Sequence, residues 1–122
     1  SMFREAVRLA ILGYHFQRIT AYHLRIAEFT RYLKDKEKVF ERIVSEMHTA
    51  SEKQVMAIED DIRRILTQVQ RSYRALPDEF RIFAEDAISS FYDSVQVQLK
   101  NVNDLDSFEH LTCISHDMKD VG

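Results

Sequence analysis

The chain has very few of the residues that make tight turns. Among its 122 residues there are two glycines, Gly13 and Gly122, and one proline, Pro77. Because hairpins between β-strands depend on turns rich in glycine and proline, this scarcity argues against a β-sheet. Phosphate-binding loops need several closely spaced glycines, so they are excluded as well. We therefore predict an all-α protein.

Cysteine and long apolar runs are also scarce. Cys113 is the only cysteine, so no internal disulfide forms, which fits a reducing compartment. A membrane-spanning helix needs about 20 consecutive apolar residues, and Arg18 and Arg25 interrupt the most apolar region. We therefore expect a cytoplasmic protein without a membrane partner. The chain also lacks the G-x-S-x-G turn that exposes a catalytic serine, and we expect no enzymatic activity and no cofactor.

The most regular apolar pattern lies in residues 55–76. Apolar side chains recur there every three or four residues, which is typical of one buried face of a helix. They are Val55, Ile58, Ile62, Ile65, Val69, Tyr73 and Leu76. A hydrophobic content of 45% supplies enough such residues for a folded core. We expect one helical domain over residues 1–122, built as a bundle of three to four helices with long, coiled-coil-like helices.

The first predicted helix, residues 3–34, has two apolar faces. One has the alternating three- and four-residue spacing of a coiled coil, and we call it the seam: Leu9, Leu12, Phe16, Ile19, His23, Ile26, Thr30 and Leu33. The other face carries several aromatic residues. Two apolar faces require two neighbours, so we expect this helix at the centre of a bundle or shared between subunits. Aromatic side chains are enriched at buried interfaces, and our candidate interface residues are Tyr14, Tyr22, Phe29 and Tyr32, with intramolecular core as the alternative.

The ends of the remaining helices are less distinct. We expect a turn near Asp35, although the apolar pattern continues past it, and a second helix over residues 36–76. Whether that helix breaks near Thr49, where Thr49 and Glu52 have the spacing of a capping box, is left open. Pro77 begins a third helix over residues 78–102, and a short last helix is predicted over residues 105–118.

Charge is unevenly distributed along the chain. Residues 1–42 carry nine Lys/Arg against five Asp/Glu, whereas residues 77–122 carry three against ten. Either the two segments lie beside each other, or one meets a charged partner. A basic face on the predicted helix 55–76 suggests a nucleic-acid-associated regulator as the alternative function; its residues are Arg63, Arg64, Arg71 and Arg74. Acidic residues early in the third helix suggest instead a surface for a basic partner.

Two groups of residues in the sequence carry side chains that can bind metal. His110, Cys113 and His116 follow one another at three-residue intervals, which is compatible with zinc, yet positions six residues apart diverge on a helix and a fourth ligand is missing. An ordinary amphipathic helix explains them better. His15 and His23 lie in the first helix without the Glu-x-x-His pairs of di-iron bundles. We therefore expect no metal.

These observations favour a non-enzymatic helical module that binds other proteins, as an adaptor or as an inhibitor or immunity-type protein. Its surplus apolar faces would engage a second copy of the chain, giving a homodimer, or a helix of another protein.

Overall fold

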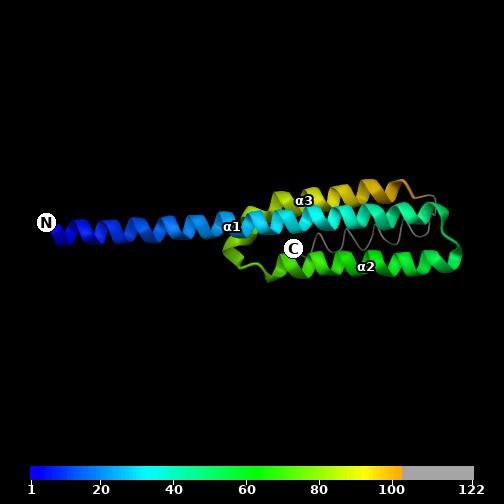
Figure 1. Cartoon of the computed structure of the whole chain (residues 1–122), viewed down its shortest axis with the longest axis horizontal. Coiled ribbons are helices and arrows are strands. Elements are labelled where there is room, and N and C mark those ends of the chain that lie inside the picture. Colours follow the sequence, from blue (N-terminus) through cyan, green and yellow to red (C-terminus); the bar gives the residue numbers. More distant parts are fainter. Residues whose placement is uncertain (103–122) are drawn as a thin grey trace.

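The computed structural model describes residues 1–102, and in this part of the chain all regular structure is helical. Helix α1 spans Met2–Glu46, α2 spans Glu52–Ala75 and α3 spans Asp78–Lys100. A single 3₁₀ turn, η1 (Met47–Thr49), follows α1. Figure 1 shows α2 and α3 lying along the C-terminal half of α1, while its N-terminal half projects beyond them as a free rod. The predicted all-α bundle is confirmed.

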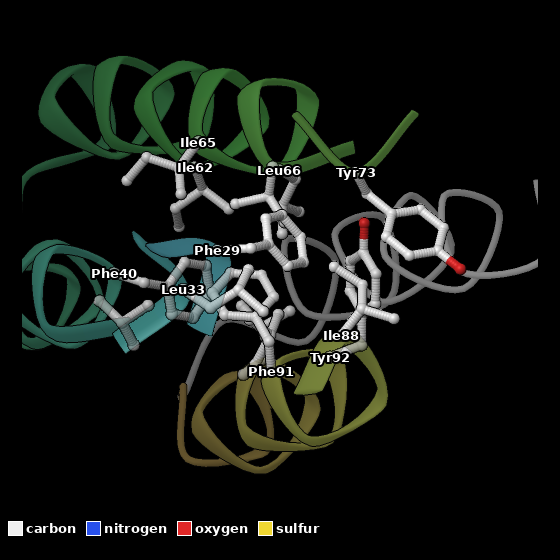
Figure 2. Packing of buried hydrophobic residues seen from close by; sticks show 14 of the residues in the cluster. Phe29, Leu33, Phe40, Ile62, Ile65, Leu66, Tyr73, Ile88, Phe91 and Tyr92 are labelled. Carbon is white, nitrogen blue, oxygen red and sulfur yellow. The ribbon is translucent and has the colours of Figure 1, made fainter. Parts of the chain in front are cut away.

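The core lies where the three helices run side by side. Each helix contributes one apolar stripe, and Figure 2 shows these side chains pointing toward one another between the helices. Those buried most completely are Phe40, Phe91, Ile62, Leu66, Leu99, Val69 and Val95. The α2 stripe contains the predicted residues Ile58, Ile62, Ile65, Val69 and Tyr73. Since α1 first becomes buried at Phe29, the core supports only its C-terminal half.

The turn predicted near Asp35 is wrong, because α1 continues through it to Glu46. No glycine or proline interrupts this segment, so nothing in the backbone opposes the helix. Leu33 and Phe40, one heptad apart, both enter the core, and Phe40 is 0% exposed. The continuous apolar pattern was the correct signal.

The break near residue 49 does occur, two residues beyond the predicted cap. After η1, Ala50 is extended and Ser51 caps α2. Ser51 Oγ accepts a hydrogen bond from the Gln54 backbone N–H at 3.4 Å, and Gln54 Oε1 accepts one from the Ser51 N–H at 2.9 Å. This reciprocal capping box satisfies two otherwise unpaired N–H groups at the start of α2, so α1 and α2 can fold back on each other.

Pro77 separates α2 from α3 as predicted. Leu76 is extended with its side chain in the core, and α3 begins with Asp78 and Glu79, two acids that interact favourably with the helix dipole. The predicted helix over residues 105–118 lies outside the described residues. Within residues 1–102, none of the helices combines the length and apolarity needed to cross a membrane.

Candidate protein-binding surface

The projecting part of α1, which we call the arm (residues 2–25), is unusually apolar for a surface. All residues from 1 to 21 are exposed. Ten of the fourteen exposed large hydrophobic side chains lie on the arm: Met2, Phe3, Val7, Leu9, Ile11, Leu12, Tyr14, Phe16, Ile19 and Leu24. Isolated exposed apolar residues are normal on a protein surface, but a contiguous patch marks an interaction site. The arm is therefore the candidate site.

The apolar residues of the arm surround the helix. The seam residues Leu9, Leu12 and Phe16 lie on one side, and Phe16 is 72% exposed. At 100° per residue, Ile11 and Tyr14 point to the opposite side. Charged residues are absent between Arg8 and Arg18. A helix that is apolar all round is normally buried on several sides, whereas the bundle leaves the distal arm bare.

At its base, the arm is joined to α3 by an aromatic cluster. The Tyr22 ring packs edge-on against Phe80, with ring centroids 4.6 Å apart, and lies 5.8 Å from the Phe83 ring. Arg18 donates hydrogen bonds from Nη2 to Tyr22 Oη at 2.6 Å and to Glu79 Oε2 at 3.3 Å. The hydrogen bond to Tyr22 raises the pKa of the Arg18 guanidinium. These contacts fix the direction in which the arm leaves the bundle.

A hollow of about 390 Å³ lies beside this cluster, where the seam reaches the bundle. Its walls are Ile19, His23 and Ile26 of the seam together with Tyr22 and Phe83. Phe83 and its neighbour Ile82 are largely exposed on α3. The exposed seam thus leads directly into an apolar pocket shared by α1 and α3.

The four predicted interface residues fall in three environments. Tyr14 is exposed on the arm, and Tyr22 is half-buried at its base. Phe29 is 5% exposed and belongs to the core, as the alternative interpretation held. Tyr32 is half-buried and its Oη accepts a hydrogen bond from Ser72 Oγ of α2 at 3.0 Å. Only Tyr14 and Tyr22 therefore belong to the candidate surface.

The arginine face suggested for nucleic-acid binding is closely paired with acids. Arg63 Nη1 lies 2.7 Å from Asp60 Oδ1, and its Nη2 lies 3.4 Å from Glu59 Oε2. Arg64 Nη1 lies 2.9 Å from Asp61 Oδ1. Arg71 and Arg74 are exposed further along α2. Phosphate binding depends on uncompensated positive charge, so these carboxylates weaken the electrostatic case for this face.

Metal ligands do not gather in the part of the chain that the structure describes. Across residues 1–102, no three His, Cys, Asp or Glu side chains are grouped as a metal site would require. His15 is exposed on the arm and His23 lines the apolar hollow. His110, Cys113 and His116 lie outside the described residues.

Sequence reasoning missed part of this surface. The seam was recognised, but only the aromatic face was selected as interface, so Leu9, Leu12 and Phe16 were left out. Their regular spacing was the available signal. No sequence signal identified Phe83 as their neighbour, because that depends on how α3 packs on α1. Compared with protein-family models, curated proteins and solved structures, the chain gives no match.

Proposed function

We propose that this protein is a helical protein–protein interaction module whose binding element is the arm. The observation that carries the proposal is the concentration of exposed large apolar side chains on the arm, which projects beyond the bundle. Burial of apolar surface contributes about 25 cal/mol per Å², so covering these side chains with a partner favours association, against the cost of ordering both molecules.

The arm has the form of a helix that packs against other helices. Apolar anchors spaced three and four residues apart are the pattern by which one helix lies in a groove or against a second helix. The aromatic residues Tyr14 and Phe16 add large contact areas with few rotatable bonds. A homodimer with coiled-coil character is the arrangement we propose first.

The module would act by binding rather than by catalysis, as an adaptor or as an inhibitor or immunity-type protein. The exposed large hydrophobic side chains, most of which lie on the arm, form the kind of surface that binds another protein. The single cysteine of the chain suits a reducing compartment, and we place the protein in the cytoplasm.

A pair of variants tests the arm as the binding element. Leu12→Glu combined with Phe16→Glu places two charges on the arm, where both side chains are exposed. Met56→Glu is the matched control, because Met56 is 71% exposed near the start of α2 and does not belong to the arm. All proteins should retain the same helical circular dichroism.

The readouts are self-association, by light scattering, and capture of binding proteins from cell extract, by quantitative mass spectrometry. We expect the arm variant to lose association by more than tenfold while the Met56→Glu protein behaves as wild type. Absence of both self-association and arm-dependent capture would overturn the proposal.

A further inference from the structure

We propose that the arm binds the arm of a second copy of this chain, in an antiparallel pair with Leu12 of one copy packed against Phe16 of the other. This inference rests on the proposed function and specifies its partner and register. In this arrangement the two bundles lie at opposite ends of the paired arms, and the N-terminal turn of each copy reaches the hollow at the base of the other.

The register follows from the seam. In an antiparallel pair of helices, the two kinds of seam position face each other, so the residue numbers of each facing seam pair have the same sum, and the sums for residues beside the seam differ from it by two. The seam spacing, continued toward the N-terminus, adds Glu5 and Met2, and setting Leu12 against Phe16 aligns the seam positions from Met2 to Ile26. The facing pairs are Leu12 with Phe16, Leu9 with Ile19, Glu5 with His23, and Met2 with Ile26. Both central pairs are apolar, and the one acid meets an imidazole.

Residues beside the seam are compatible with the same register. On one side, Gly13 faces Gly13 of the other copy, and Ala6 faces Thr20. These small side chains permit close approach of the helices, and the space around Gly13 is empty to 4 Å. On the other side, Arg8 faces Tyr22, a position suited to a cation–π contact.

Most arginines of the arm lie away from the face that would contact the second copy. Arg4, Arg18 and Arg25 share one heptad position on the far side of the helix from the seam. They give the arm a positive charge, whereas the first part of α3 carries Asp78, Glu79, Glu85 and Asp86 against one arginine. Since the arm of the copy ends beside α3, opposite charges are brought together.

The hollow can accommodate the N-terminal turn of the other copy's arm. Its seam residues Ile19, His23 and Ile26 are those that face Leu9, Glu5 and Met2 of the copy. Phe83 closes the hollow from α3 and offers a second apolar wall. The antiparallel arrangement therefore gives each hollow a facing N-terminal turn.

A parallel pair of arms satisfies fewer of these features. It would set Glu5 against Glu5 and His23 against His23, so that like groups face each other across the seam. It would also place the two bundles side by side at the same end of the paired arms. Neither hollow would then face the N-terminus of the other copy. Only the seam and its flanking residues within residues 2–26 meet the copy, and the paired segments are about 36 Å long at about 1.5 Å per residue.

Solution mass is the first test, on the full chain. We expect a particle of twice 14.4 kDa, reduced to 14.4 kDa by Leu12→Glu with Phe16→Glu. The charge-swapped protein Leu12→Glu with Phe16→Lys should recover the dimer, because its glutamate faces a lysine of the copy only in the antiparallel register. In a parallel pair the same protein would set glutamate against glutamate, and it would remain monomeric.

Disulfide trapping tests the register directly, with Cys113→Ser as the background. Gly13→Cys should cross-link to itself on mild oxidation, whereas Phe16→Cys should cross-link only when mixed with Leu12→Cys. Because nothing within 4 Å meets a Cβ at Gly13, the first variant has room within its own chain. Circular dichroism and the mass of the reduced proteins confirm that each variant still folds and associates.

The outcomes separate this inference from the proposed function. A 14.4 kDa particle at about 1 mM, where complexes with Kd near 1 mM would be populated, overturns the second-copy partner. Arm-dependent capture of a different protein in that case leaves the proposed function standing. A dimer that cross-links through Phe16→Cys alone, or that resists Leu12→Glu with Phe16→Glu, overturns the antiparallel pairing.

Discussion

The ring of Tyr22 lies edge-on against that of Phe80, with centroids 4.6 Å apart, and this contact joins the arm to the bundle. Beyond it, toward the N-terminus, the Arg18–Glu79 ion pair connects α1 with α3, and Ile19 lines the same hollow as Phe83. Exposed ion pairs contribute about 0–1 kcal/mol. Tyr22 therefore marks the boundary between the supported and the unsupported part of α1.

Replacing Tyr22 tests this boundary. Tyr22→Ala should lower the free energy of unfolding by about 1 kcal/mol, because it removes a half-buried ring and its aromatic pairs. Tyr22→Phe keeps the ring but loses the hydrogen bond from Arg18, and it should cost less than half as much. Urea unfolding followed by circular dichroism measures both. Equal stability of Tyr22→Ala and wild type would show that the contact does not support α1.

The core of α2 gives a second prediction. Ile62 is 0% exposed between the three helices, so Ile62→Ala should cost about 2–5 kcal/mol through lost burial and the cavity left behind. Met56→Ala, on the exposed side of the same helix, should change stability by about 0.5 kcal/mol or less. Urea unfolding compares the two variants through their midpoint concentrations, provided that the dependence of the free energy of unfolding on urea is the same for both. Similar losses for both would contradict the assigned core.

The α2 capping box predicts a contrast between two neighbouring hydroxyl residues. Ser51→Ala should cost about 1 kcal/mol, because the backbone N–H of Gln54 loses its acceptor. Thr49 lies in η1 and is exposed, so Thr49→Ala should have little effect. Thermal unfolding of the two variants decides between the caps. A larger effect at Thr49 would favour the cap expected from sequence.

Tyr92 predicts a loss of stability in alkali. Burial raises the pKa of Tyr92 from 10.0 to about 12. The unfolded chain therefore releases this proton near pH 10 while the folded chain keeps it, so the stabilisation is complete below about pH 10 and is lost as pH rises through about 12. The loss is on the order of 2–3 kcal/mol.

The measurement is the urea-derived free energy of unfolding between about pH 9 and 12. Tyr92→Phe should weaken the pH dependence of the free energy of unfolding. Burial raises the pKa of Tyr73 as well, so a residual dependence remains in Tyr92→Phe. Identical pH profiles for Tyr92→Phe and wild type would contradict the assigned burial.

The stripe of α2 was readable from sequence, because its spacing matches a helix with one buried face. Ile62 and Val69 were assigned to that face and are fully buried. Pro77 gave the start of α3 within one residue, since a proline is suited to the first turn of a helix. These features depend on residue spacing and on the conformational preference of proline, and both can be read directly from the sequence.

The length of α1 was misjudged for a physical reason. A turn at Asp35 was expected because a folded chain was assumed to cover both apolar faces of its first helix. In the structure, residues 29–44 are covered while the arm is not. Tertiary packing decides which apolar side chains of α1 are covered by the other helices. The spacing of apolar residues in the sequence does not reveal this. The cap at Ser51 was overlooked, although Ser51 and Gln54 have the required spacing.

Because α1 is continuous from Met2 to Glu46, its length fixes the distance between its tip and the bundle. Each residue adds about 1.5 Å, so the number of residues in the arm sets how far its tip lies from the bundle. Seven inserted residues would move the tip outward by about 10.5 Å and nearly preserve the direction in which the seam faces. Three or four inserted residues would lengthen the rod by about half that distance and shift the seam around it. The length of α1 therefore sets both the distance of the tip from the bundle and the direction in which the seam faces.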